Sequence, residues 1–112
     1  MRIAFTTKGT KWESEMDARF GRTEFFLIYD EEKDEFTEFD NRAIGGEAHG
    51  AGPKTAQKLF ELQAEVLITG NGPGGNAATV LEKAGMNIYI GAIDITVKQA
   101  YDAYKKNELK KI

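Results

Sequence analysis

The order in which strand-like and helix-like segments follow one another is the strongest constraint on this fold. Three segments near the start of the chain, residues 2–7, 24–30 and 35–40, have the apolar pattern of β-strands. Beyond residue 52, helical patterns alternate with short apolar strands at residues 65–69 and 87–90. We therefore predict an α/β fold with the order β-β-β-α-β-α-β-α, in which helices cover the faces of a mixed five-stranded sheet.

The strand pattern also predicts a hairpin. Residues 24–30 form a nearly continuous apolar run, which is typical of a central strand. A charged turn follows, and in residues 35–40 polar and apolar side chains alternate. Because such alternation is typical of a strand with one exposed face, we expect residues 35–40 to lie outside residues 24–30.

Three helices are expected in the second half of the chain. The first begins near Pro53, the second can be capped by Asn76 and ends at Gly85, and the third opens with capping-box spacing from Thr96 to Gln99. Apolar residues spaced by three and four positions predict the buried face of each helix. These residues are Ala56, Leu59 and Phe60, with Gln63 as a further position, in the first helix, Ala77, Val80, Leu81 and Ala84 in the second, and Val97, Ala100, Tyr101 and Tyr104 in the third.

Composition limits the chemistry that the chain can perform. Its 112 residues correspond to a single domain, residues 1–112. The absence of cysteine excludes disulfide scaffolds, thiolate zinc sites, thiol nucleophiles and iron–sulfur clusters ligated by cysteines of this chain. The net charge of −3 provides no basic stripe for a nucleic-acid partner. No apolar run approaches the ~20 residues of a membrane span, so we expect a cytoplasmic protein without membrane contact.

A glycine-rich segment between a predicted strand and a predicted helix is the clearest candidate binding site. Glycines allow several backbone amides to converge on one anion, and the N-terminus of a helix favours negative charge. We therefore predict that this segment contacts a small anionic ligand. The predicted contacts are Gly70, Asn71, Gly72, Gly74, Gly75 and Asn76.

The same segment has the G-x-G-x-x-G spacing of dinucleotide-binding loops, from Gly70 to Gly75. Asp94 follows Gly75 by 19 residues, where a ribose-binding acid is expected. Against this interpretation, the following helix is short, Pro73 occupies a turn position, and the chain is too short for both halves of a dinucleotide fold. A nucleotide-binding protein is the alternative hypothesis.

Two arginines just before the apolar strand form a second candidate site. Arg19 and Arg22 flank a Phe-Gly pair. Because the planar guanidinium group binds carboxylates and phosphates well, the two arginines could hold an anion. The alternative is a solvated surface cluster in which Asp17 and Glu24 pair with them.

The single histidine, His49, lies in a segment flanked by glycines. It is either a surface residue without a role or, if a metal binds, the only imidazole ligand that the chain offers. The first predicted strand carries no carboxylate, which argues against a two-metal nuclease site. Because no set of catalytic residues is found, we do not expect an enzyme.

Several motifs follow one another along the chain: Met1-Arg2-Ile3-Ala4, Arg19-Phe20-Gly21-Arg22, Phe25-Phe26-Leu27-Ile28, His49-Gly50-Ala51-Gly52 with the helix after it, Gly70 to Ala77, Ile88-Tyr89-Ile90-Gly91, the Val97-to-Tyr104 helix and Glu108-Leu109-Lys110. Taken in this order, they resemble the dinitrogenase iron–molybdenum cofactor biosynthesis family, the small domains related to NifX, NafY and the C-terminal part of NifB. The resemblance covers essentially the whole chain. It implies a three-layer α/β/α fold with a ribonuclease H-like motif and no nuclease activity. It also implies a non-catalytic role in binding or carrying an iron–sulfur or iron–molybdenum cofactor precursor, with cofactor-assembly proteins as partners.

The resemblance also implies a set of site residues. Besides the glycine-rich segment, these are Arg19, Phe20, Gly21, Arg22 and His49. Many members of the family have a histidine before the Phe-Gly pair, where this sequence has Arg19. Without cysteine, a cluster would depend on His49, on oxygen or thioether donors, or on amides and arginines that hold an anionic cluster at its periphery.

Overall fold

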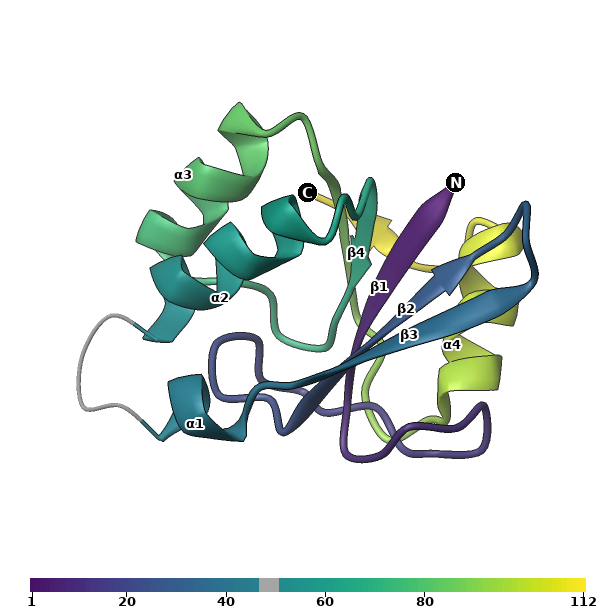
Figure 1. Ribbon diagram of the computed structural model, residues 1–112. Helices are drawn as coiled ribbons and strands as arrows, with labels where there is room; N and C mark the ends of the chain where they lie inside the picture. Colours follow the sequence, from purple (N-terminus) through teal and green to yellow (C-terminus); the bar gives the residue numbers. More distant parts are fainter. Residues whose placement is uncertain (47–50) are drawn as a thin grey trace.

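The structure of the protein, a computed structural model, describes residues 1–46 and 51–112. These residues form a six-stranded sheet with helices on both faces (Figure 1). The strands are β1 (Arg2–Thr7), β2 (Phe25–Asp30), β3 (Glu35–Asp40), β4 (Val66–Ile68), β5 (Asn87–Ile90) and β6 (Lys110–Lys111). The helices in the described residues are α1 (Arg42–Gly45), α2 (Ala51–Glu61), α3 (Gly75–Lys83) and α4 (Val97–Lys105).

The sheet is mixed, with the strand order β3-β2-β1-β4-β5-β6. β2 pairs antiparallel with β1 and with β3, which confirms the predicted hairpin. β4 is parallel to β1, and β5 is parallel to β4, as expected for a ribonuclease H-like motif. Because β1, β4 and β5 run in one direction, the loops that follow them lie along the same edge of the sheet.

Two apolar layers confirm the three-layer α/β/α architecture. α2 and α3 cover one face of the sheet, and α4 covers the other. β1 contributes to both layers because successive side chains of a strand point to opposite faces. Ala4 packs in the layer beneath α2 and α3, whereas Ile3 and Phe5 pack in the layer beneath α4. The whole of β1 after Arg2 is buried, so it is the central strand of the core.

Two elements lie outside the predicted order and change it to β-β-β-α-α-β-α-β-α-β. β6 extends the five predicted strands to six by pairing antiparallel with β5. Both of its residues are exposed lysines, so no apolar alternation indicates a strand, and its pairing depends on the tertiary fold. α1 is a single helical turn, which is too short to show a period in the sequence.

The predicted helix faces are confirmed except at three positions. Phe60 is 54% exposed, Gln63 is exposed beyond the end of α2, and Ala84 is exposed just beyond the end of α3. The buried stripe of α2 runs through Ala56 and Leu59, and Phe60 lies one position past it. The capping box of α4 is present as predicted. Among the described residues, the helices are all too short or too polar to span a membrane.

Candidate binding site

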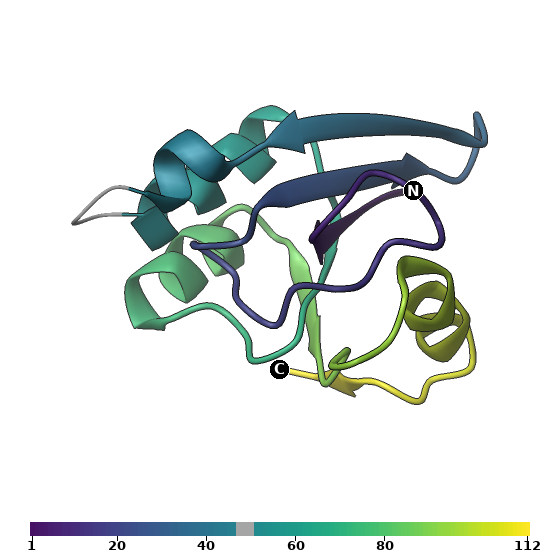
Figure 2. The same cartoon turned by 90° about the horizontal axis from the view of Figure 1, so that it is seen from below.

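Two loops meet at the edge of the sheet where β1 and β4 end. The arginine loop, residues 17–24, leads into β2, and the glycine loop, residues 70–75, leads from β4 into α3. The Asn71 amide donates a hydrogen bond to the Ala18 carbonyl oxygen, with an N to O distance of 2.8 Å. In Figure 2 the arginine loop passes beside the starts of α2 and α3. The fold therefore brings together two motifs that are far apart in the sequence.

Two glycines allow the arginine loop to pack closely against the glycine loop and against α2. A Cβ atom on Gly70 would lie 2.6 Å from the Cα of Ala18, and a Cβ on Gly21 would lie 2.8 Å from backbone atoms of Gly52 in α2. Because the atoms that a side chain would meet belong to the backbone, neither contact can be relieved by a rotamer change. Gly70 and Gly21 are therefore required for packing.

The glycines at the start of α3 have different surroundings. Gly74 is the N-cap residue and Gly75 the first residue of α3, and a Cβ on either would meet no described atom within 4 Å. Gly74 has no side chain that could accept hydrogen bonds from the first-turn amides. Among the described residues, the space beside Gly74 and Gly75 where a Cβ atom would lie is therefore open. It adjoins the end of α3 where the first amide N–H groups lack acceptors within the helix and the positive end of the helix dipole lies. Gly72, with φ of +90°, needs glycine for its backbone conformation.

The prediction that Asn76 caps this helix was wrong. α3 begins two residues earlier than predicted, at Gly75 with Gly74 as its N-cap, so Asn76 lies within the first turn. An N-cap residue has a non-helical backbone, and this is the conformation of Gly74, whose φ is −68° and ψ 170°. The first turn of α3 is consequently left without the side-chain acceptor that an asparagine cap would have supplied.

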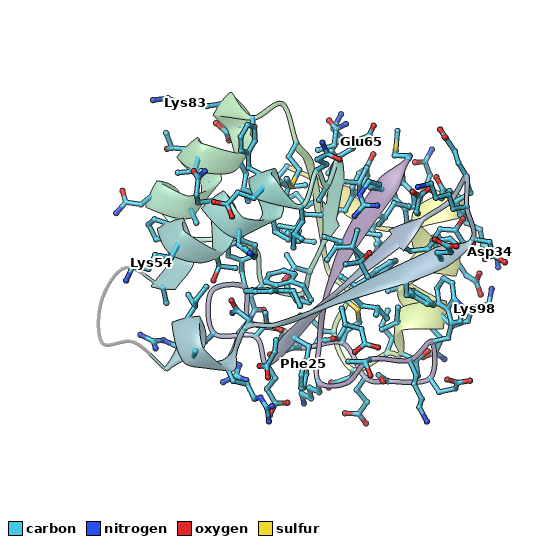
Figure 3. The ribbon with its side chains drawn as sticks, in the orientation of Figure 1. Phe25, Asp34, Lys54, Glu65, Lys83 and Lys98 are labelled. Carbon is cyan, nitrogen blue, oxygen red and sulfur yellow. The ribbon has the colours of Figure 1, made fainter. Side chains whose placement is uncertain are left out.

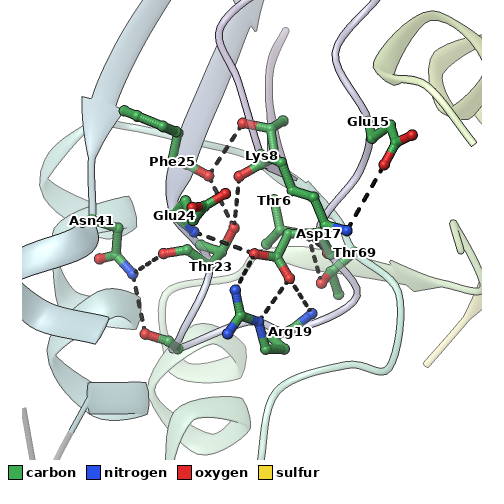
Figure 4. Close-up of polar contacts among 12 residues, drawn as sticks. Thr6, Lys8, Glu15, Asp17, Arg19, Thr23, Glu24, Phe25, Asn41 and Thr69 are labelled. Atoms are coloured by element: carbon green, nitrogen blue, oxygen red, sulfur yellow. Dashed lines mark hydrogen bonds and ion pairs between the residues drawn. The ribbon is translucent and has the colours of Figure 1, made fainter. Parts of the chain in front are cut away.

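Asp17 holds Arg19 in a fixed position within the arginine loop (Figure 4). Its Oδ1 atom accepts hydrogen bonds from the Arg19 backbone N–H and Nε–H, both at 3.0 Å, and its Oδ2 atom accepts from Nη2 at 2.8 Å. Oδ2 also accepts from the backbone N–H of Glu24 at 3.3 Å. The side chain of Asp17 is 2% exposed, whereas that of Arg19 is 56% exposed. One edge of the guanidinium is therefore bound, and the rest of the group reaches solvent.

The ionisation of this pair follows from its contacts. Burial disfavours the charged form of Asp17, but hydrogen bonds and the charge of Arg19 outweigh this effect and hold the pKa of the carboxyl below its ordinary value of 3.8. The side-chain hydrogen bond to Asp17 in turn raises the pKa of Arg19. Both groups are therefore charged at neutral pH, and the carboxylate is already occupied by four N–H donors.

Buried polar groups support the arginine loop from the side of the sheet. The Thr6 hydroxyl, at the end of β1, donates to the Asp17 carbonyl oxygen at 2.7 Å. The Asn41 amide nitrogen donates to the carbonyl oxygens of Gly21 and Thr23 at 3.1 and 3.0 Å. Among the described residues, each buried side-chain nitrogen or oxygen atom has a hydrogen-bond partner. Hydrogen bonds therefore hold the backbone of the arginine loop at several points along its length.

The other predicted site residues have diverse surroundings. The Phe20 ring belongs to the core, where it is 4% exposed and its centroid lies 5.7 Å from that of Phe26. Arg22 is exposed on the arginine loop. His49 lies outside the described residues. The residues that are exposed at or near the glycine loop are Asn71, Gly74, Gly75 and Asn76.

Asp17 is the main residue that the sequence analysis missed as part of the site. The alternative of a solvated surface cluster is wrong for Asp17, because this residue is 1% exposed, although Arg19 is largely exposed. Thr6 and Thr69, whose hydroxyl oxygens lie 2.9 Å apart, were also missed. These threonines occur at the ends of two buried strands, and polar residues in that position are a pattern that could have indicated the site.

A separate cleft of about 270 Å³ lies between α2 and α3. Figure 3 shows Lys83, one of its lining residues, at the end of α3 that is remote from the glycine loop. The cleft therefore lies outside the binding site. Its lining residues are Gln57, Phe60, Val80, Lys83 and Ala84.

The donors in the described part of the site fit an anion better than a bare metal ion. No three residues of His, Cys, Asp or Glu come together as a metal site within residues 1–46 and 51–112. The groups that reach solvent are instead the Arg19 guanidinium and the start of α3. A charged anion whose outer atoms accept hydrogen bonds matches these donors.

Comparisons with known proteins agree with the resemblance. The family model described as dinitrogenase iron-molybdenum cofactor matches residues 1–107. The apo form of the orange protein from Desulfovibrio gigas is 32% identical, with a TM-score of 0.92 over 99% of this chain and 92% of that chain. A provisionally assigned NifB protein of the DUF35 family from Thermotoga is 35% identical, with a TM-score of 0.82 over 97% of this chain and 90% of that chain.

Comparison with curated protein sequences gives no match. Neither the family nor the two related structures is described as nucleotide-binding, so nothing here supports the alternative hypothesis based on Asp94. The family match extends over nearly the whole of the 112 residues. This chain therefore belongs to the dinitrogenase iron-molybdenum cofactor family.

Proposed function

We propose that this protein binds and carries an anionic metal cofactor or its precursor, without catalysing a reaction on it. The observation that carries the proposal is the open N-terminus of α3 at Gly74 and Gly75, in the same loop cluster as the exposed Arg19. The family is that of the iron-molybdenum cofactor, and the Desulfovibrio gigas structure is described as an apo form. Apo is the term for the ligand-free form of a protein that binds a ligand.

The donors of the site fit such a cargo through its outer atoms. Sulfide and oxygen atoms at the surface of a metal cluster accept hydrogen bonds, and hydrogen bonds to cluster sulfurs are one of the ways in which a protein sets the reduction potential of a cluster. The first-turn amides of α3 and the Arg19 guanidinium supply N–H donors and positive potential. The cargo would bring its own metal ligands, because this chain has no cysteine.

Two further residues belong to the proposal. Arg22 would add a second positive charge on the arginine loop, and His49 would supply the only imidazole of the chain. Proteins of cofactor assembly are the proposed donors and recipients of the cargo. A carrier of this kind would hold the cofactor reversibly, which is consistent with contacts made through hydrogen bonds and charge.

Anaerobic titration with isolated iron-molybdenum cofactor tests the proposal. Binding is expected to change the visible absorption of the cofactor, and metal analysis of the desalted complex gives the stoichiometry. Arg19→Ala should weaken binding about tenfold or more, because a hydrogen bond to a charged group contributes about 1.5–3 kcal/mol and about 1.4 kcal/mol corresponds to a factor of ten. The matched control is Lys83→Ala, which removes one exposed positive charge from the far end of α3.

Gly75→Ala tests the start of α3 itself. A Cβ atom there meets no described atom, so the fold should tolerate it and gain about 0.5–1 kcal/mol of stability. The same methyl group would occupy space beside the first-turn amides and weaken binding of the cofactor. No binding by the wild-type protein, or equal losses in Arg19→Ala and Lys83→Ala, would contradict the proposal.

A further inference from the structure

The contact between Asp17 and Arg19 is more extensive than a surface ion pair requires. The carboxylate accepts both Nε–H and Nη2–H of the guanidinium, so the plane of that group is fixed as well as its position. Asp17 is itself immobilised, since it is buried and its Oδ2 atom also accepts the Glu24 backbone N–H. A long side chain that extends into solvent is thus held at its base by a rigid acceptor.

We propose that Asp17 is a positioning residue for anion binding, which holds the Arg19 guanidinium so that its outer N–H groups form a preset donor pair for the cargo. This inference rests on the proposed function. Asp17 occupies Nε–H and one N–H of Nη2. In the described residues no acceptor is bonded to Nη1, so this nitrogen and the second N–H of Nη2 are directed away from Asp17.

Positioning changes affinity because binding otherwise immobilises a flexible arginine. When the side chain is already ordered, less conformational entropy is lost on binding. Asp17 makes no contact with the cargo in this arrangement and acts only through Arg19. The chemical class that such an edge recognises is an anion with two adjacent acceptor atoms, as in a bidentate contact.

The chain contains a matched control pair. Asp40 accepts from the Arg42 backbone N–H and Nε at 3.0 Å and from Nη2 at 2.7 Å, which are nearly the same contacts. The side chain of Asp40 is 50% exposed, however, so water competes for its oxygens. Asp40→Asn therefore removes one carboxylate charge, as Asp17→Asn does, but leaves the buried acceptor of Arg19 intact.

A measurement without any ligand tests the positioning itself. In ¹⁵N NMR spectra of the wild-type protein, exchange of the Arg19 Nε proton with water should be about tenfold slower than that of Arg42, because only the first pair is protected by a buried partner. This comparison needs no variant and therefore no assumption about folding. Equal exchange rates for the two arginines would overturn the inference, whatever the protein binds.

Binding of isolated iron-molybdenum cofactor to the wild-type protein and four variants then tests the consequence. Asp17→Asn should weaken binding about three- to tenfold, the effect of freeing one side chain that must be reordered. In the Arg19→Ala background the same substitution should have no effect, because Asp17 acts through Arg19. Asp40→Asn should leave binding unchanged.

The outcomes separate this inference from the proposed function. Asp17→Asn could instead reduce the affinity equally in the wild-type and Arg19→Ala backgrounds. This would show that Asp17 only stabilises the loop, and it would overturn the inference while the proposed function stands. Slow exchange at Arg19 with no binding by the wild-type protein would overturn the proposed function, and with it the role of Asp17 in binding. Coupled losses together with slow exchange would support both.

Discussion

Asp17–Arg19 and Asp40–Arg42 are two copies of one local arrangement. In each, an aspartate accepts three hydrogen bonds from the arginine two residues later, through the backbone N–H, Nε and Nη2. They differ in the burial of the acceptor, since the Asp17 side chain is 2% exposed and that of Asp40 is 50% exposed. The spacing of the residues therefore determines the contact, and the surroundings determine how rigid it is.

The surroundings of the two pairs explain this difference. Asp17 lies where the arginine loop passes the end of β1, with the Thr6 hydroxyl hydrogen-bonded to its carbonyl oxygen. Asp40 ends β3, which is the edge strand of the sheet and exposes its polar side chains. A central position in the sheet supplies buried partners, and an edge position does not.

The largest expected effect on stability comes from overpacking the contact between the glycine loop and the arginine loop. Gly70→Val places a side chain where even a Cβ would lie 2.6 Å from the backbone of Ala18. We expect a loss of about 3 kcal/mol in the free energy of unfolding, at the upper end of overpacking effects. Urea denaturation measures it. Gly74→Ala is the control, since a Cβ there meets no described atom; an equal loss in both variants would contradict the packing that distinguishes the two glycines.

A smaller effect is expected when the two acceptors are compared directly. Asp17→Asn replaces one acceptor oxygen with an NH₂ group that faces N–H donors, which should reduce the free energy of unfolding by about 2 kcal/mol. Asp40→Asn should cause a much smaller change, because water can replace the lost contacts of an exposed pair. Denaturation midpoints at constant m-value test this order. Similar losses from the two variants would mean that burial does not distinguish the pairs.

The smallest effect is expected in the pH dependence of stability. The pKa of Asp17 is lowered below 3.8, and the hydrogen bonds from Arg42 lower the pKa of Asp40 to about 2. A carboxyl whose folded pKa is depressed stabilises the protein fully above its unfolded pKa and loses this contribution as the pH falls through the folded value. The stability difference between wild type and Asp17→Asn should therefore be constant above pH ~5 and shrink below pH ~4. A difference that grows on acidification would show the opposite shift.

Much of the fold could be predicted because the core pattern is local. The hairpin of β2 and β3, the alternation of strands and helices after residue 52 and the capping box at Thr96 all follow from short-range periodicity. β6 could not be predicted in this way, since two exposed lysines pair with β5 only because the chain returns to the sheet edge. The exposure of Phe60 likewise depends on how α2 is rotated on the sheet.

The candidate site was predicted in its parts but not in its arrangement. Arg19 and the glycines could be singled out because their chemistry is unusual for a core or a helix. Their roles could not, since Gly70 and Gly75 are both glycines in one loop, yet only Gly70 is packed against backbone. The alternative of a solvated surface cluster paired Asp17 with the arginines, and the ion pair with Arg19 is present, but the burial of Asp17 is visible only in the fold.

By itself, the sequence determined the class of the fold, the family and the absence of thiolate chemistry, because periodicity, motif order and residue counts are properties of the linear chain. The tertiary structure alone decided which of two equivalent Asp-x-Arg pairs has a buried aspartate and which glycines are packed against described backbone atoms. Burial and close approach arise from segments distant in sequence, here the arginine loop, the glycine loop and the start of α2. A local pattern carries no information about the neighbours that folding brings to it.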